Sequence, residues 1–222
     1  MNNTTSLPPN RNQQVWIARH GNRLDFVDPE WFSNAILPYD PPLSDDGIIQ
    51  AQELAKRLEN EAIAHIFVSP FLRTIQTAWE VAKVLNLPLK IEAGLGEWLN
   101  PDWMTHHPET LTKETLYSKY PCIDRKYQSC VVPKYPETET QMLARTATVV
   151  QQLVKEYPEN ILLIGHGASV LGATQGLLRS PISLQVTLCC LTQLIRTSEG
   201  WKLTLKGDTS HLSQPQQPIR WH

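Results

Sequence analysis

Apolar and polar residues are grouped along this chain in a way that predicts buried strands alternating with amphipathic helices. The runs 15–18 and 161–164 are wholly apolar, as expected of short strands buried on both faces of a parallel sheet. The segments 63–68 and 90–93 predict two more strands. Residues 186–195 and 201–205 flank a Ser-Glu-Gly turn and predict a hairpin near the C-terminal end.

Helices are predicted where a capping residue precedes apolar residues spaced by three and four positions. Three starts are marked in this way: Ser44 followed by two aspartates, Ser69 followed by a proline, and Thr138 in a capping box with Gln141. A fourth helix is expected just after Gly167. The apolar stripes of the first three helices are Ala51, Leu54, Ala55 and Leu58; Ile75, Ala78, Trp79 and Ala82; and Leu143, Ala147, Val150 and Val154.

The region from about 99 to 137 interrupts this rhythm with five prolines and five aromatic residues. A long loop-rich insertion in a compact domain is usually functional or disordered, and the aromatic residues argue against disorder. We therefore expect a cap beside the active site, with one helix near 109–119. The whole pattern predicts one α/β domain over residues 15–207, with residues 1–14 and 208–222 as extended or disordered tails.

Composition narrows the class of protein. A content of 41% hydrophobic and 19% charged residues is ordinary for a globular protein, and a net charge of −2 favours neither nucleic acid nor a membrane as partner. No apolar run approaches the ~20 residues that cross a bilayer, and residues 1–14 lack an apolar signal segment. The four cysteines form no Cys-x-x-Cys pair, so we expect free thiols in the cytoplasm. The edge of the terminal hairpin offers a surface for a homodimer.

Two of the apolar runs end in a histidine beside a glycine, as Arg19-His20-Gly21 and as Gly165-His166-Gly167. Ligands of open α/β sheets bind beyond the carboxyl ends of the strands, so both imidazoles are expected at one site. Arg23 closely follows the first motif, and Arg73 is expected in the first turn of the helix that follows strand 63–68. The pair of strands that each end in a histidine beside a glycine is the strongest functional signal in the sequence.

Guanidinium groups gathered around one point repel one another unless an anion lies between them, and their planar fork matches the oxygens of a phosphoryl group. A neutral imidazole can attack phosphorus and carry the phosphoryl group covalently. Glu97 supplies a group that can protonate the leaving oxygen and later activate water. The set predicts a phosphomonoesterase that requires neither a metal ion nor another cofactor.

Four separated motifs resemble those of the histidine phosphatase superfamily, also called the phosphoglycerate-mutase-like family. They are Ala18-Arg-His-Gly21, the stretch from Ser69 to Ala78 that contains Arg73, Gly94-Leu-Gly-Glu-Trp98, and Gly165-His-Gly167. The resemblance spans about residues 15–179 and implies a three-layer α/β/α sandwich with a mostly parallel sheet. It implies His20 as the nucleophile, Glu97 as the proton donor, and Arg19, Arg73 and His166 as phosphate ligands.

Within the superfamily, the stretch from Arg19 to Asp25 is similar to the branch of the Sts and ecdysteroid-phosphate phosphatases, in which the second arginine, here Arg23, also binds phosphate. Asn22 departs from the glutamate that is usual in that branch. The resemblance implies a metal-independent phosphatase acting on a small phosphate monoester or a phosphopeptide. A phosphoglycerate-type mutase and an inactive phospho-ligand binding module are the alternatives. Trp31, Tyr39, Trp98 and Trp103 are candidates for the wall of an aromatic pocket.

Overall fold

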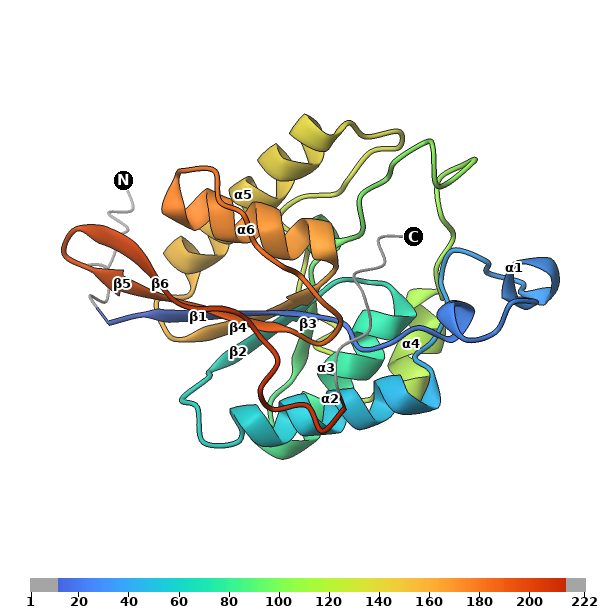
Figure 1. Cartoon of the computed structure of the whole chain (residues 1–222), viewed down its shortest axis with the longest axis horizontal. Coiled ribbons are helices and arrows are strands. Elements are labelled where there is room, and N and C mark those ends of the chain that lie inside the picture. The colour runs from blue at the N-terminus through green and yellow to red at the C-terminus, as the bar shows by residue number, and fades with distance from the viewer. Residues whose placement is uncertain (1–11, 215–222) are drawn as a thin grey trace.

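The computed structural model describes residues 12–214, which form a six-stranded sheet with helices on both faces (Figure 1). The strand order is β3-β2-β4-β1-β5-β6; β3, β2, β4 and β1 run parallel, and β5 and β6 are antiparallel additions at one edge. The strands are β1 (Gln14–Arg19), β2 (His65–Val68), β3 (Leu89–Ile91), β4 (Ile161–Gly165), β5 (Leu191–Thr197) and β6 (Gly200–Asp208). Residues 1–11 and 215–222, which make up most of the two predicted tails, lie outside the described residues.

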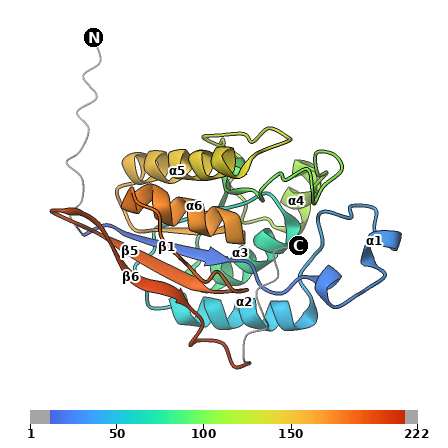
Figure 2. The same ribbon diagram turned by 45° about the horizontal axis from the view of Figure 1, so that its top comes forward.

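Helices α5 (Glu139–Glu156) and α6 (Gly167–Leu178) cover one face of the sheet, and α2 (Asp45–Leu58) and α3 (Leu72–Leu85) cover the other (Figure 2). Alternate residues of β1 show the division: Val15 and Ile17 pack into the core under α5 and α6, whereas Trp16 and Ala18 pack into the core above α2 and α3. This period of two explains why the run is apolar throughout. The expected three-layer α/β/α sandwich is confirmed.

The helix starts follow the sequence signals with one exception. The Ser44 side chain accepts a hydrogen bond from the Gly47 N–H at the start of α2, and Thr138 and Gln141 form the predicted capping box of α5. Ser69 does not cap α3, which begins at Leu72 with Phe71 as its N-cap. The prediction was wrong there: the N-cap lies two residues later, and the Ser69 hydroxyl contacts His166 and accepts from the Phe71 N–H. On the buried face of α3, Val81 is fully buried and Trp79 is only partly so.

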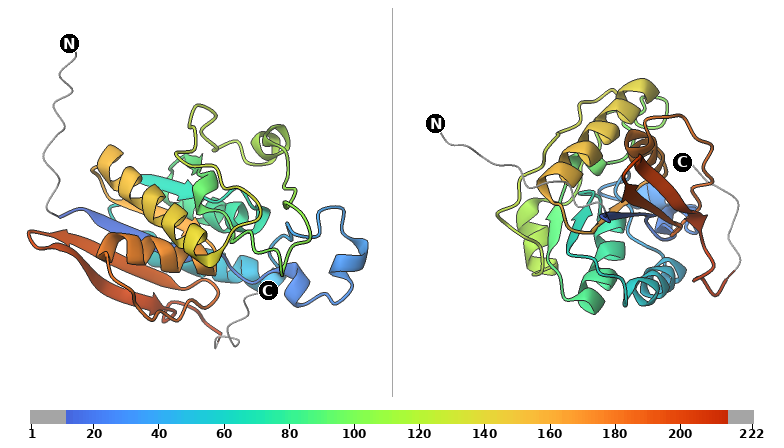
Figure 3. Two further views of the ribbon diagram at one scale, coloured as in Figure 1. Left: turned by 90° about the horizontal axis from the view of Figure 1, so that it is seen from above. Right: turned by 90° about the vertical axis from the view of Figure 1, so that its left-hand side faces the viewer.

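The segment 99–137 packs around the β3 edge of the sheet and contains one helix, α4 (Lys113–Lys119), shorter than the expected 109–119. Leu116 and Ile123 are buried in the core on the α2 and α3 side, whereas Tyr127 and Cys130 pack against the core on the other side. Figure 3 shows this segment, in green, on the side of the molecule where α1 (Trp31–Asn34) projects. Its role as a cap stays a prediction.

None of the helices among residues 12–214 is long and apolar enough to cross a membrane. All four cysteines are free. Cys189 and Cys190 lie just before β5 and are buried in the cores on opposite faces of the sheet. The hairpin begins later than expected, at Leu191, and β6 forms an edge of the sheet, where a homodimer contact remains a prediction.

Candidate active site

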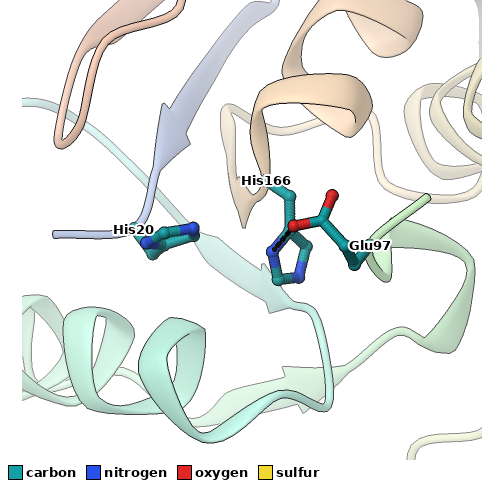
Figure 4. A group of neighbouring side chains, drawn as sticks. All are labelled: His20, Glu97 and His166. Carbon is teal, nitrogen blue, oxygen red and sulfur yellow. Dashed lines mark ion pairs between the residues drawn. The ribbon is translucent and has the colours of Figure 1, made fainter. Parts of the chain in front are cut away.

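The two histidine motifs lie side by side because their strands are neighbours. Strands β1 and β4 are parallel, with Arg19 paired to Gly165, so the next residue of each strand is a histidine at the same sheet edge. The His20 backbone N–H donates to the Gly165 carbonyl at 3.0 Å. The ring centroids of His20 and His166 are 5.3 Å apart, with an interplanar angle of 64°. Figure 4 shows both rings with Glu97 beside His166.

The ring of His20 has one bonded and one unbonded nitrogen. Its Nδ1 lies 2.7 Å from the Gly21 carbonyl oxygen, which can only accept, so Nδ1 carries the proton and Nε2 carries a lone pair. Nε2 is buried and has no hydrogen-bond partner among the described residues. Burial, and repulsion from the guanidinium groups of Arg73 and Arg19, hold the pKa of His20 well below its usual value. The imidazole is therefore neutral near pH 7.

Two glycines set the path of the chain just after His20. A Cβ on Gly21 would lie 2.5 Å from the Gly47 carbonyl oxygen, and a Cβ on Gly47 would clash with the Asn22 carbonyl. The loop and the first turn of α2 therefore touch backbone to backbone. This close approach positions the Gly21 carbonyl that holds the His20 ring.

His166 differs from His20 because both of its ring nitrogens have side-chain neighbours. Nε2 lies 2.8 Å from the Ser69 hydroxyl, and Nδ1 lies 3.2 Å from both the Arg73 guanidinium and the Glu97 carboxylate. Its backbone N–H donates to the Ser169 hydroxyl at the start of α6, which gives Ser169 a capping role. Burial lowers the pKa of His166 to about 4 against the attraction of Glu97.

Three arginines converge on these rings. Arg73 is fully buried and donates through Nη2 towards Glu97, at 3.3 Å; burial and repulsion from Arg23 lower its pKa to about 10. Arg19 donates to the Val186 carbonyl at 2.7 Å. Arg23 forms a two-pronged ion pair with Asp25, in which Nε lies 2.9 Å from Oδ1 and Nη2 bonds to the second oxygen. This pairing fixes the orientation of the Arg23 guanidinium. The structure thus brings together every residue predicted to act in catalysis or to bind phosphate.

Glu97 lies in the loop after the 3₁₀ turn η2 (Ala93–Leu95) and directs one carboxylate oxygen to Arg73 and His166. The other oxygen accepts from the Trp98 N–H at 3.1 Å. Burial raises the pKa of Glu97, but attraction to His166 and Arg73 outweighs burial and holds the pKa well below its usual range. An anion bound among the arginines would raise that pKa again, because it would offset their charge.

One ligand atom from each of His20, Glu97 and His166 lies within 4.8 Å of the others, a spacing compatible with a metal ion. The charges around these atoms favour an anion instead. Arg73 Nη2 already contacts one Glu97 oxygen and the Nδ1 of His166. A second cation at that point would meet the repulsion of Arg73 and its neighbours.

A small cavity of about 50 Å³ forms the mouth of the site. It is lined by Arg23, Arg73 and Glu97 together with Phe32, Tyr39, Trp103 and Met104. Two of the four aromatic residues predicted to form a pocket wall, Tyr39 and Trp103, line this mouth. The other two do not line it: the Trp31 indole donates to the Pro38 carbonyl, and the Trp98 indole donates to the Glu137 carbonyl. A larger cavity of about 530 Å³, near the β5–β6 turn, contains none of the candidate residues.

Sequence reasoning missed two residues that organise the site. Ser69 contacts His166, although the sequence suggested only a helix cap. Asp40 is buried and accepts from the N–H groups of Leu72, at the start of α3, and of Leu111, in the 99–137 segment. Burial raises the pKa of Asp40 against the attraction of Arg73. No local sequence signal identifies an aspartate that joins two distant loops.

Comparisons with known proteins give the family of the chain and relatives with a similar sequence or fold. The model of the histidine phosphatase superfamily (branch 1) matches residues 15–209. The transcription factor tau 55 kDa subunit of Saccharomyces cerevisiae is 34% identical over 177 residues, covering 74% of this chain. The ecdysteroid-phosphate phosphatase of Drosophila melanogaster is 26% identical over 240 residues, covering 87% of this chain. The chain spans only 40% and 32% of the lengths of these two relatives.

A solved structure with a similar fold is the ecdysone phosphate phosphatase of Bombix mori in complex with tungstate. The two structures match with a TM-score of 0.77 at 21% sequence identity, and the match covers 94% of this chain and 98% of that chain. At this identity the likeness concerns the fold. It agrees with the α/β/α sandwich.

Proposed function

The chain belongs to branch 1 of the histidine phosphatase superfamily, and we propose that it hydrolyses an organic phosphate monoester through a phosphohistidine intermediate on His20. The observation that carries the proposal is the state of the His20 ring. Its Nδ1–H is held by the Gly21 carbonyl, and its Nε2 is buried without a partner in the described part of the chain. A neutral imidazole with one free lone pair is a competent nucleophile.

The arginines supply the binding energy for the phosphoryl group. Arg19, Arg23 and Arg73 would bind its non-bridging oxygens, and His166 would donate a further hydrogen bond. As charge spreads over these oxygens in the transition state, preformed donors in a buried site stabilise it more than water does. No step requires a metal ion, so activity is proposed to persist in EDTA.

In the first step, the Nε2 lone pair of His20 forms a bond to phosphorus and the ester P–O bond breaks. The leaving oxygen takes a proton from Glu97. The bound dianion offsets the positive charge that lowers the pKa of Glu97, and so shifts the carboxyl towards its protonated form.

In the second step, Glu97 is ionised and accepts a proton from water while that water attacks phosphorus. The N–P bond breaks, inorganic phosphate leaves, and His20 returns to its neutral state. If the alcohol product took the phosphoryl group in place of water, the same residues would act as a mutase.

The mouth of the site favours an organic leaving group, because Phe32, Tyr39, Trp103 and Met104 present apolar surface beside the arginines. A small phosphate monoester or a phosphopeptide side chain meets this requirement. We also propose a reducing compartment such as the cytoplasm, where the free cysteines would stay reduced.

The test is a phosphate-release screen over phosphosugars, nucleotides, phosphotyrosine peptides and steroid phosphates, with and without EDTA. We expect phosphate release from at least one class and no loss in EDTA. A parallel incubation with 3-phosphoglycerate separates the alternatives, since formation of the 2-isomer without free phosphate would identify a mutase. Phosphate binding without any turnover would identify an inactive binding module.

A further inference from the structure

The loop that carries Glu97 receives no support from strand or helix hydrogen bonds at that residue, so its backbone needs other donors. Arg145 on α5 provides them. Its Nη1 donates to the carbonyls of Gly94 at 2.8 Å and Gly96 at 3.2 Å, and its Nη2 donates to the Glu97 carbonyl at 3.1 Å. One side chain thus bonds three backbone carbonyls within four residues of the loop.

The other side of the Arg145 guanidinium is held by Glu137, which lies just before α5. Nε donates to Oε1 and Nη2 donates to Oε2, both at 2.7 Å. Together with the three bonds to the loop, these account for the five N–H donors that a guanidinium possesses. The pair is nearly fully buried, with 5% of each side chain exposed.

Glu137 also holds the chain that follows Glu97. Its backbone N–H donates to the Leu99 carbonyl at 2.9 Å, and its carbonyl accepts from the Trp98 indole N–H at 2.7 Å. Arg145 and Glu137 therefore fix the backbone before, at and after the proposed acid. They hold it from the α5 side of the sheet, whereas Arg73 contacts the carboxylate from the α3 side.

We infer that Arg145 and Glu137 are positioning residues for Glu97, which they hold through its backbone at hydrogen-bonding distance from His166 and Arg73. The inference rests on the proposed role of Glu97 as acid and base. A buried ion pair is by itself weak evidence for stability, because desolvation offsets most of its Coulomb energy. Here, the guanidinium N–H groups of Arg145 that do not bond to Glu137 donate to the loop that carries Glu97. Loss of the pair would leave Glu97 present but displaced from the leaving oxygen.

The dependence of rate on the leaving group separates positioning from a structural role. The value of kcat/KM reports the first chemical step, in which Glu97 protonates the leaving oxygen. The p-nitrophenolate ion leaves without that proton, whereas the more basic oxygen of phenyl phosphate needs it. A displaced acid therefore slows phenyl phosphate selectively, and a general loss of folded enzyme slows both substrates equally.

The experiment compares Arg145→Met, Arg145→Lys and Glu137→Gln with the wild-type enzyme and with Glu97→Gln as the reference for a missing acid. We expect kcat/KM of Arg145→Met to fall about 100-fold for phenyl phosphate and less than about 5-fold for p-nitrophenyl phosphate. Lysine keeps the charge but lacks the fork, so Arg145→Lys follows the same pattern. Equal losses on both substrates, or no loss on either, would overturn the inference.

The matched control is Arg57→Met, which removes a partly exposed arginine paired with Glu61 near the end of α2. It is expected to leave both rates within about twofold of wild type. If Arg145→Met does not fold, Arg145→Lys and Glu137→Gln carry the same comparison.

Amide hydrogen exchange gives a second readout that needs no turnover. Faster exchange confined to the backbone of residues 94–99 in Arg145→Lys supports the inference, and unchanged exchange there overturns it. A wild-type enzyme inert on every phosphate monoester would refute the proposed function, and the exchange result would still decide whether the pair holds the loop.

Discussion

Strands β1 and β4 are each followed by a histidine next to a glycine, yet the two imidazoles have different hydrogen-bond partners. Both rings are fully buried. The Nδ1 of His20 is bonded to a backbone carbonyl, and its Nε2 has no partner among residues 12–214. His166, by contrast, has Ser69 at one nitrogen and Arg73 and Glu97 at the other. In the proposed mechanism, only the ring of His20 is therefore ready to attack.

The difference arises from the segment into which each strand leads. After His20 the chain turns against the first turn of α2, and the Gly21 carbonyl faces back to the ring. After His166 the chain enters α6 at once, and the His166 backbone takes part in the N-terminal cap of that helix. The His166 ring therefore contacts side chains rather than a backbone carbonyl. In the proposed mechanism, the surrounding hydrogen bonds rather than the motif therefore decide which ring acts as the nucleophile and which as the phosphate ligand.

The largest effect is expected for His20→Ala, which removes the proposed nucleophile and with it the covalent route. Turnover should fall by at least about 10⁴-fold, measured as phosphate release on the best substrate of the screen. Binding of inorganic phosphate, measured by calorimetry, should persist because the arginines remain. Substantial turnover in this variant would contradict the assignment of His20.

His166→Ala tests the second ring. The variant loses one donor to the transferring phosphoryl group but keeps the nucleophile, so kcat should fall about 10²- to 10³-fold, less than in His20→Ala. Rapid-quench kinetics should still detect a phosphoenzyme. A loss as complete as that of His20→Ala, without phosphoenzyme, would erase the distinction between the two rings.

A smaller effect is expected for Ser69→Ala, which removes the hydroxyl that holds Nε2 of His166. The buried nitrogen loses its partner, and kcat should fall about tenfold with little change in KM. Thr148→Ala on the exposed side of α5 is the control, expected to match wild type. An unchanged kcat in Ser69→Ala would show that the ring of His166 does not depend on this bond.

The mildest test is a pH titration of the two rings by NMR. Burial and the arginines disfavour the imidazolium, so His166 should titrate near its lowered pKa of about 4 and His20 well below the usual 6.5. Since the unfolded chain binds protons at higher pH, these two groups lose their contribution to folding stability as pH falls below 6.5 towards 4. A midpoint near 6.5 for either ring would contradict the described burial and charge.

Much of this site could be predicted from the sequence because its chemistry lies at the ends of apolar runs. The positions of His20 and His166 follow from two strand patterns and the rule that parallel strands end at one edge. The layers follow in the same way, since fully apolar strands need helices on both faces.

The supporting residues could not be predicted, because their partners are distant in the chain. Arg145 lies on the buried face of α5, among apolar residues, and its partner Glu137 lies outside the helix. Ser69 carries a local signal for a helix cap, and a tertiary contact overrides that signal. Periodicity identifies which face is buried, but it does not identify which buried polar groups meet.

The decisive experiment identifies the residue that carries phosphate during turnover. Glu97→Gln, supplied with p-nitrophenyl phosphate, should accumulate the intermediate, because that leaving group needs no acid in the first step whereas the second step lacks its base. Rapid quenching at alkaline pH followed by peptide mass spectrometry should locate the label. We expect an acid-labile phosphoryl group on His20, bonded at Nε2. A phosphoryl group on His166 or on an acid-stable residue, or no label in an enzyme that turns over, would contradict the proposed mechanism.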